Sequence, residues 1–199
     1  MRNVGIIKVG GTSLMYEKQI ELVTTIMSED SRRRYVVVSA PGDPEKKNRV
    51  TQQLITLAQY RGKKDSQKSA VNEIIDFLVA KYEMVYSGKG GFVGDRIRVQ
   101  FQESTLPQNR YTSALKAVGE ELQAKLLAEA LGFKFVDTKD FFVLSGDYHN
   151  AQVLPETYDK IRILQSQDEK LVFPGFYGAT KEGHIATFSL GGSNKSGSI

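Results

Sequence analysis

The sequence predicts an α/β domain with a largely parallel central sheet. Three observations support this fold class: short apolar runs rich in β-branched residues, longer segments with apolar residues at helical spacing, and an alternation of the two along the chain. Strands that alternate with helices are typical of βαβ units, whose strands are parallel. The length of 199 residues, with 40% hydrophobic and 25% charged residues, fits a globular domain and argues against global disorder.

Buried strands are predicted where apolar runs end in turn signals. Residues 4–9 run into Gly10-Gly11, and residues 35–39 run into the turn residues 40–44 (APGDP). The last segment, residues 176–199, is rich in glycine and predicts a hairpin followed by a loop. Further short strands are expected at residues 133–136, 141–144 and 171–173.

Helices are predicted where apolar residues recur on one face. After the first strand, Ile20, Val23 and Met27 share such a face, and Gly132 ends the longest helical pattern. Residues 95–101 fit either period, with helix favoured. One further helix is expected to begin at Thr51, and three more are expected to cover residues 71–85, 112–131 and 155–165.

The composition excludes several classes of function. The absence of cysteine excludes disulfides, thiolate metal sites and a cysteine nucleophile, and the two histidines do not suffice for a His-rich metal site, so no metal ligand is assigned. No apolar stretch approaches the ~20 residues that span a bilayer, so we expect a cytoplasmic protein without a membrane partner.

The net charge of +4 raises the alternative of a nucleic-acid-binding module. Basic residues cluster at positions 32–34 and 63–64, but no aromatic-rich binding motif accompanies them. Solvated surface charge is the simpler interpretation of these clusters, and no nucleic-acid partner is expected.

The first motif that carries chemistry is residues 8–13 (KVGGTS), between a predicted strand and a predicted helix. At such a junction free amide groups point outward, and Gly10 and Gly11 would let the backbone approach phosphate oxygens closely. Lys8 precedes the glycines, whereas the lysine of a P-loop follows them, so the motif is not a P-loop. Lys8 would instead neutralise charge on a phosphoryl group in transfer; the alternative is a tight turn with an exposed lysine.

Two further motifs provide polar groups that would contact a substrate. Ser39 ends a predicted strand, where ligands of open α/β sheets bind, and Thr51 opens the next helix. Gly119 costs ~1 kcal/mol in a helix relative to Ala and indicates a close approach to the backbone. Glu120 beside it would accept hydrogen bonds from an ammonium group. Taken alone, Ser39 is more typical of an ordinary turn and Glu120 of a solvated helix face.

The last motif comprises residues 174–178 (PGFYG) and 187–194 (TFSLGGSN). The pair Gly191-Gly192 followed by Ser193 would make a second backbone nest for anions. Two such loops in one α/β domain would hold both sides of a phosphoryl group in transfer, as a kinase requires.

Together and in this order, the motifs resemble those of the aspartate kinases of the amino-acid kinase family. Residues 8–13 are similar to the family's Lys-Phe-Gly-Gly-Thr-Ser, with Val9 in place of Phe. The Thr-Ser ending favours aspartate kinase over the acetylglutamate, glutamate 5-, carbamate and uridylate kinases of the same fold. The remaining motifs follow in family order over essentially the whole chain: residues 39–42, 119–120, 175–178 and 191–193.

The resemblance implies an amino-acid-kinase-like αβα sandwich with a mostly parallel sheet, and ATP-dependent phosphorylation of the side-chain carboxylate of L-aspartate. The product would be 4-phospho-L-aspartate, made in the first step of lysine, threonine and methionine biosynthesis. Mg²⁺ would accompany ATP, and the family suggests a homodimer. By position, Lys8 and Asn194 would be catalytic, Gly10, Gly11, Thr12, Ser13, Gly191 and Gly192 would bind phosphate or nucleotide, and Ser39, Thr51, Glu120, Phe176 and Ser193 would bind L-aspartate.

Three positions depart from the family pattern. Leu190 stands where the family has an Arg that pairs with a substrate carboxylate, and Asn194 stands where it has an Asp that orients the catalytic lysine. Ala117 replaces the Ser of a Ser-x-Gly-Glu pattern. The first two changes remove charged groups and raise the alternative of a non-catalytic relative that acts as a binding or regulatory partner.

The length is a fourth departure. Residues 1–199 are expected to be the N-terminal, substrate-binding part of the catalytic domain, so the fold would be truncated at its C-terminus. The family's nucleotide half and its ACT domains would then lie outside this chain. For this reason the resemblance leaves the activity of this chain by itself open.

Overall fold

A parallel four-stranded sheet, in the order β1-β2-β5-β3, forms the centre of the fold. Val9 pairs with Val38 and Val38 with Pro174, so β1, β2 and β5 end at the same edge of the sheet. The predicted mostly parallel sheet is therefore confirmed. The strands are β1 (Gly5–Val9), β2 (Arg33–Val38), β3 (Lys134–Phe135) and β5 (Leu171–Pro174). The structure is a computed structural model that describes every residue except 1–4, 64, 104, 166–168 and 190–191.

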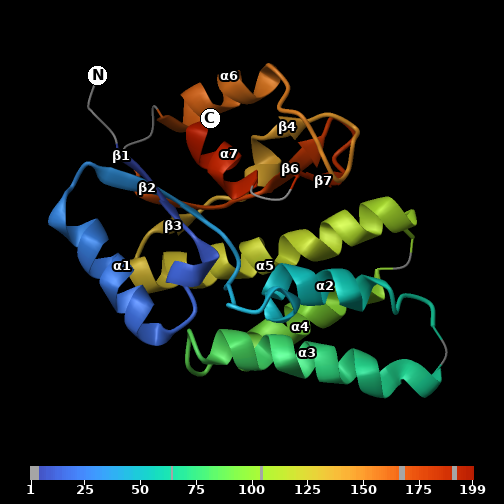
Figure 1. Cartoon of the computed structure of the whole chain (residues 1–199). Coiled ribbons are helices and arrows are strands. Elements are labelled where there is room, and N and C mark those ends of the chain that lie inside the picture. The colour runs from blue at the N-terminus through green and yellow to red at the C-terminus, as the bar shows by residue number, and fades with distance from the viewer. Residues whose placement is uncertain (1–4, 64, 104, 166–168, 190–191) are drawn as a thin grey trace.

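Helices from the first two thirds of the chain cover one face of this sheet (Figure 1). Val36, Val38 and Val172 belong to the large aliphatic core on that side. The longest helix contacts the sheet directly and ends at Gly132, whose φ of 64° gives a left-handed cap. Within the described residues, no helix has the length and apolar character needed to cross a membrane. The helices are α1 (Glu17–Glu29), α2 (Val50–Ala58), α3 (Lys68–Glu83), α4 (Gly90–Gln102), which includes residues 95–101, and α5 (Gln108–Leu131).

The opposite face of the sheet is aromatic and lies under a smaller C-terminal layer (Figure 1). Tyr35 and Phe173 pack edge to face there, with ring centres 5.9 Å apart, and Phe141 packs on Phe173. A second sheet in this layer pairs β4 with β6 in parallel and β6 with β7 as the predicted hairpin. The layer contains β4 (Val143–Leu144), α6 (Glu156–Gln165), β6 (Tyr177–Thr180), β7 (Ile185–Thr187) and α7 (Gly192–Ser198).

The end of the chain corrects one prediction. The sequence predicts a loop after the hairpin, but residues 192–198 form helix α7, which packs against β1 and β2. The sequence GSNKSGS has a weak intrinsic preference for helix, which explains the wrong prediction. Burial of Gly192, Ser193 and Ser196 compensates for that weakness. Ser196 Oγ also accepts a hydrogen bond from the amide of Phe176 at 2.9 Å and donates to the carbonyl of Gly192.

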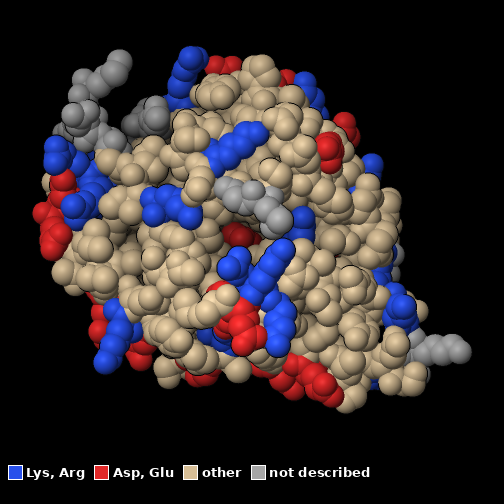
Figure 2. All heavy atoms as spheres, in the orientation of Figure 1, with Lys and Arg blue, Asp and Glu red and all other residues tan. Residues whose placement is uncertain are grey.

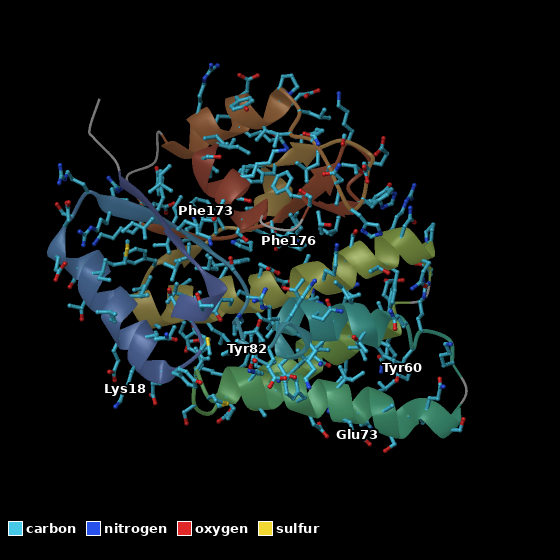
Figure 3. All side chains as sticks on the ribbon, viewed as in Figure 1. Lys18, Tyr60, Glu73, Tyr82, Phe173 and Phe176 are labelled. Atoms are coloured by element: carbon cyan, nitrogen blue, oxygen red, sulfur yellow. The ribbon has the colours of Figure 1, made fainter. Side chains whose placement is uncertain are left out.

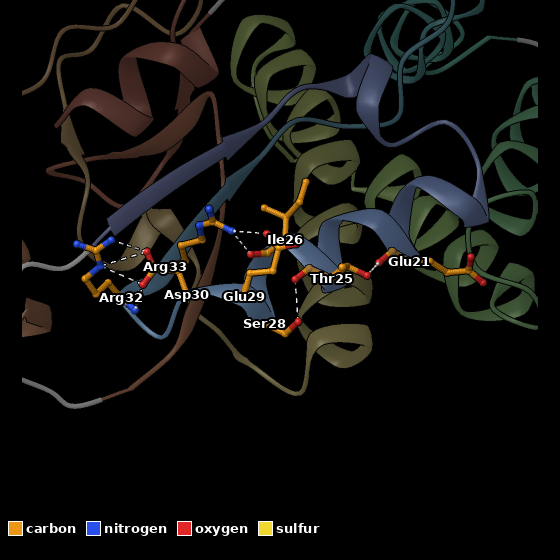
Figure 4. A network of polar contacts seen from close by, with 8 residues as sticks. All are labelled: Glu21, Thr25, Ile26, Ser28, Glu29, Asp30, Arg32 and Arg33. Atoms are coloured by element: carbon orange, nitrogen blue, oxygen red, sulfur yellow. Dashed lines mark hydrogen bonds and ion pairs between the residues drawn. The ribbon is translucent and has the colours of Figure 1, made fainter.

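The arginine triplet, residues 32–34, lies where α1 leads into β2, and each of its members has a partner within the chain. Figure 4 shows the contacts of Arg32 and Arg33. Arg32 forms a two-pronged pair with Asp30, with Nη2 2.8 Å from Oδ2 and Nε 3.0 Å from Oδ1. This pair lowers the pKa of Asp30 to about 2. Arg33 contacts Glu29 at 3.3 Å, and Arg34 donates to a backbone carbonyl. Contacts within the chain therefore account for this basic cluster.

Candidate functional site

A cavity of about 360 Å³ lies at the carboxyl edge of the central sheet. It is bounded by the segments that follow β1 and β2, by the starts of α2 and α7, and by the middle of α5. Figure 2 shows a hollow in this face with acidic atoms deep inside it and Lys and Arg side chains around it. The lining residues are Lys8, Gly10, Gly11, Thr12, Ser39, Ala40, Pro41, Gly42, Lys46, Arg49, Thr51, Gln52, Ile55, Glu120, Phe176, Gly192, Ser193 and Asn194.

Most residues that the sequence predicts for a site line this one cavity. Ser13 does not, because it sits at the end of a short 3-10 turn and its amide donates back to the carbonyl of Gly10 at 2.9 Å. Gly191, like Leu190, lies outside the described residues. The sequence interpretation missed the cations Lys46 and Arg49 on the cavity lining. Their position directly before a predicted helix at the sheet edge is the signal that could have identified them.

Two glycine-containing turns interlock below the cavity. The amide of Gly42 donates to the carbonyl of Gly11 at 2.8 Å. A Cβ on Gly11 would lie 2.5 Å from the carbonyl oxygen of Ala40, and one on Gly42 would lie 2.7 Å from the Gly11 carbonyl carbon, so only glycine fits at either place. Lys8 extends over the same turn, with its Nζ 3.3 Å from where a Cβ on Gly10 would stand. An ammonium group thus lies beside close-packed backbone, as a phosphate site requires.

Gly119 lets α2 approach α5 closely, as the sequence predicts. A Cβ at this position would lie 3.0 Å from Val50 Cγ1 and 3.2 Å from Leu54 Cδ1. The carbonyl of Gly119 accepts a hydrogen bond of 2.6 Å from the hydroxyl of Tyr82, which lies between α3 and α5 (Figure 3). This packing brings the start of α2, with Thr51, beside the next residue of α5, Glu120.

Glu120 is a buried acid, not a solvated surface residue. Only 4% of it is exposed, and its Oε2 has no hydrogen-bond partner among the residues that the structure describes. Burial raises the pKa of Glu120 to about 8, although hydrogen bonding from the Ala40 backbone and the Thr51 side chain, and the charge of Lys116, act to lower it. Glu120 is also the one acidic residue among the described residues that line the cavity. It would hold a proton near neutral pH until a cation arrives.

Phe176 lies on the C-terminal side of the cavity and has a strained backbone. Its φ of 79° is the one positive value among the described non-glycine residues. Such strain persists only where the surroundings impose it, and it is concentrated at functional sites. Here the amide of Phe176 donates to Ser196 Oγ at 2.9 Å, and its carbonyl accepts from the amide of Phe188 at 2.8 Å. Figure 3 shows Phe176 above α5, on the side of the C-terminal layer.

The cationic part of the lining is fixed by an ion pair below it. Asp43 pairs with Lys81 of α3, and the Lys81 ammonium lowers the pKa of that carboxyl. Arg49, directly before α2, donates from Nε to the carbonyl of Asp43 at 3.2 Å. Lys46 lies in the 3-10 turn just before it and also lines the cavity. Two exposed cations are thus held at the rim by a segment that α3 anchors.

The described residues form no cluster of three or more His, Asp or Glu side chains that could hold a metal ion. Magnesium prefers a few carboxylates together with substrate phosphates over a cage of protein ligands.

The fold is that of an α/β protein with a mostly parallel sheet, and its cavity lies at the carboxyl edge of that sheet, where ligands of such proteins bind. The chain belongs to the amino acid kinase family, whose sequence profile matches residues 3–198. Aspartokinase 3 of Bacillus subtilis (strain 168) is 33% identical to it over 208 aligned positions, which cover 98% of this chain and 45% of that protein. The chain therefore spans less than half the length of this curated relative.

Solved structures of aspartate kinases share the fold. The aspartate kinase of Clostridium acetobutylicum superposes with a TM-score of 0.79 at 23% identity, over 97% of this chain and 43% of that one. Aspartokinase III of E. coli, in complex with lysine and aspartate, superposes with a TM-score of 0.80 at 18% identity, over 96% of this chain and 45% of that one. In both sequence and structure, this chain resembles the aspartate kinases.

Proposed function

We propose that this chain is the amino-acid-binding part of an ATP-dependent aspartate kinase. The observation that carries the proposal is the buried carboxyl group of Glu120, whose Oε2 has no partner among the described residues. The other charged residues among the described lining of its cavity are the cations Lys8, Lys46 and Arg49. L-Aspartate has the complementary set of charges, one ammonium and two carboxylates. The sequence similarity to Aspartokinase 3 supports the same assignment.

The ammonium group of L-aspartate binds Glu120 in this proposal. Because burial raises the pKa of Glu120 to about 8, the carboxyl group is largely protonated in the empty site near neutral pH. The arriving ammonium replaces that proton and gives the buried carboxylate the partner that it lacks. The hydroxyl of Ser39, which lines the cavity, donates to a substrate carboxylate, while Thr51 lines the site beside it and keeps its hydrogen bond to Glu120.

ATP supplies the γ-phosphoryl group when it is bound. The bond from the γ-phosphorus to the ADP oxygen breaks, and a bond to a side-chain carboxylate oxygen of L-aspartate forms, which gives 4-phospho-L-aspartate and ADP. Lys8 stabilises the charge on the group in transfer, and the turn of Gly10, Gly11 and Thr12 binds phosphate oxygens. Gly192 and Ser193 approach from the other side, and Asn194 helps to position Lys8 by hydrogen bonding. Mg²⁺ arrives with the nucleotide phosphates.

Arg49 is proposed to bind the substrate carboxylate that is not phosphorylated. Leu190, at the place where the family pattern of the sequence analysis has an arginine, has no charge to offer. Arg49 lines the cavity, and its one described hydrogen bond uses Nε, while the two Nη groups carry the remaining donors of the guanidinium fork. A cation from the start of α2 thus serves the carboxylate in place of an arginine at position 190.

The domain assignment is part of this proposal. Residues 1–199 are taken as the substrate-binding part of the kinase, in line with the 45% of Aspartokinase 3 that they span. Contacts to the adenosine end of ATP, and those of a homodimer, would involve residues outside this part.

Calorimetric titration of the chain with L-aspartate tests the proposal. Succinate, which lacks the ammonium, and L-asparagine, which lacks one carboxylate, are the matched controls. We expect L-aspartate to bind and both controls to bind far more weakly. In a longer product that includes the nucleotide half, we expect ADP to form from ATP only when L-aspartate is present. If L-aspartate neither binds nor promotes ADP formation, the proposal is wrong.

A non-catalytic binding protein is the second candidate function. Asn194 favours it, because this residue lines the cavity with an amide where the family pattern of the sequence analysis has an aspartate. Binding of L-aspartate without any ADP formation, in a longer product that includes the nucleotide half, would support this candidate. Recovery of ADP formation in the double variant Leu190→Arg, Asn194→Asp would show that the rest of the scaffold is competent for the reaction.

A further inference from the structure

Lys116 is a buried cation that the proposed reaction does not use. It lies on α5 one helical turn before Glu120, at the spacing that brings two side chains to the same face of a helix. Only 8% of Lys116 is exposed. It is not among the residues that line the cavity, so it does not touch a ligand bound there. Burial of a lysine ammonium group lowers the stability of the folded chain unless hydrogen bonds or an opposite charge compensate for the lost solvation.

Two contacts fix the position of the Lys116 ammonium group. Its Nζ donates to Thr187 Oγ1 of β7 at 3.0 Å, and the Thr187 hydroxyl donates in turn to the carbonyl of Tyr148 at 3.0 Å. The same Nζ lies 5.2 Å from the centre of the Phe176 ring, on its face. Lys116 therefore ties α5 to the C-terminal layer and supports from behind an aromatic side chain that lines the cavity.

The charges of Lys116 and Glu120 act on each other. Burial lowers the pKa of Lys116, and the nearby carboxyl of Glu120 opposes that effect. In the same way, the charge of Lys116 lowers the pKa that burial has raised at Glu120. Because Lys116 is hydrogen-bonded to Thr187 and not to Glu120 Oε2, its field reaches the carboxylate without occupying the position that a ligand ammonium would take.

We infer that Lys116 is a positioning residue for the amino-acid site, which favours the ionised form of Glu120 and holds the Phe176 ring against the cavity. The inference rests on the proposed function for the identity of the ligand, but its effect on Glu120 exists without any ligand. Replacing the lysine by a neutral side chain removes the one positive charge on this turn of α5 beside Glu120 and leaves the burial of Glu120 unchanged.

Other charged or titratable groups near this pair do not take over the role. His149 faces Lys116 from the loop between β4 and α6, and burial followed by the Lys116 charge lowers the pKa of its ring. Tyr82 of α3 and Tyr177 of β6 also feel the charge of Glu120, but burial raises the pKa of both phenols well above the usual value. These groups are neutral near pH 7, and the cations Lys8, Lys46 and Arg49 on the cavity lining are the same in every Lys116 variant. A change in the titration of Glu120 between these variants is therefore assigned to Lys116.

The test compares four variants by carbon-13 NMR of glutamate-labelled, ligand-free chain, with Glu120→Gln used to assign the Glu120 carboxyl signal. Lys116→Met and Lys116→Gln remove the charge, and Lys116→Arg keeps it. Thr187→Val removes the hydrogen bond but keeps the ammonium. We expect the titration midpoint of Glu120 to move to higher pH in both neutral variants, and to stay close to that of the unsubstituted chain in Lys116→Arg and Thr187→Val.

Calorimetry with L-aspartate gives an independent measurement on the same variants. We expect binding to Lys116→Met and Lys116→Gln to weaken roughly tenfold near pH 7 and to approach the affinity of the unsubstituted chain as the pH rises. If the unsubstituted chain does not bind L-aspartate, the proposed function fails, while the NMR comparison still decides the role of Lys116. An unchanged Glu120 midpoint in whichever neutral variant folds would overturn the inference.

Discussion

Glu120 and Glu121 are neighbours on α5 and are both buried, with 4% and 8% exposed. They differ in the charged partners that the chain supplies to each carboxyl group. Burial acts to raise the pKa of Glu121, but Arg96 and Lys125 outweigh it and lower that pKa. Arg96 donates to both carboxylate oxygens of Glu121, at 2.7 and 3.0 Å, and Lys125 donates to one of them at 2.7 Å. Glu120 lines the cavity, its Oε2 has no partner within the described part of the chain, and its pKa is raised to about 8.

The difference separates a carboxylate that stabilises the fold from one that is ready to bind a ligand. A buried acid with all its partners supplied by the chain needs nothing further. A buried acid without a partner costs stability, and such a group in a cavity marks a functional site. Because the two residues share a helix, a residue type and a degree of burial, each serves as the control for the other.

The largest expected effect is the loss of ligand binding in Glu120→Gln. The amide keeps the shape of the side chain but offers no charge to an ammonium group, so L-aspartate affinity should fall roughly a hundredfold or more. Glu121→Gln should leave that affinity within a factor of about two, because its side chain does not line the cavity. Calorimetry on both variants makes the comparison, and equal losses in the two would refute the distinction.

In thermal and urea unfolding, the two variants should differ in sign: Glu120→Gln should stabilise the protein at high pH, whereas Glu121→Gln should destabilise it. Between the unfolded pKa of 4.5 and the folded pKa of about 8, folded Glu120 keeps a proton that the unfolded chain has lost. The free energy of unfolding therefore falls as pH rises through this range, and Glu120→Gln removes that fall, so the variant becomes the more stable protein at pH 8. A Glu120→Gln variant whose unfolding curve follows that of the unsubstituted chain at every pH would contradict this account.

Glu121→Gln should destabilise the protein by about 2 kcal/mol near neutral pH, because Arg96 would lose its charged partner. The pKa of Glu121 is lowered in the folded state, so its contribution is present above the unfolded value of 4.5 and is lost as pH falls through the folded value. Urea unfolding at several pH values should therefore show the deficit shrinking in acid. If the loss of unfolding free energy in Glu121→Gln grew as the pH fell, the assignment of a lowered pKa to Glu121 would be wrong.

A smaller effect on stability and on L-aspartate binding is expected when a substitution displaces α2 from Glu120 without changing any charge. In Gly119→Ala, the new Cβ would lie 3.0 Å from Val50 Cγ1 and would push α2, with Thr51, away from Glu120. The gain in helix propensity offsets part of the strain, so we expect a net loss of ~1 kcal/mol in unfolding free energy and weaker L-aspartate binding. Gly91→Ala in α4 meets nothing within 4 Å and should stabilise the protein slightly, with binding unchanged.

The smallest effect is expected at the rim. Arg49→Met should weaken L-aspartate binding roughly fivefold, because an exposed cation is screened by solvent and salt. Lys47→Met is the matched control, since Lys47 is exposed, pairs with Glu45 and does not line the cavity. Calorimetry at low and high salt should show a salt-dependent loss only in the Arg49 variant. Equal losses in both variants would remove Arg49 from the proposed site.

Periodicity and turn chemistry were sufficient to predict most of the fold. The strands before Gly10 and Ala40 and the long helix that ends at Gly132 follow from apolar spacing and turn residues alone. Helix α7 could not be predicted in this way, because GSNKSGS has poor helix propensity and only its burial against β1 and β2 makes it helical. Tertiary packing overrides local preference at this point.

The part of the site that consists of the glycine-containing motifs and Lys8 could be predicted from the sequence. The distinction between Glu120 and Glu121 was not, because the sequence shows two identical residues side by side. It depends on Arg96, which reaches Glu121 from a different helix. Arg49 was missed for a similar reason, since its segment lacks a regular pattern and the contact with Asp43 that fixes it exists only in the folded chain.

The uptake or release of protons on L-aspartate binding tests the central claim most directly. Calorimetric titration near pH 7 in two buffers of different ionisation enthalpy measures the number of protons released per ligand bound. With a Glu120 pKa of about 8, the unsubstituted chain should release close to one proton for each L-aspartate bound, and Glu121→Gln should do the same. Binding without proton release in the unsubstituted chain would show that Glu120 is not the partner of the ammonium group.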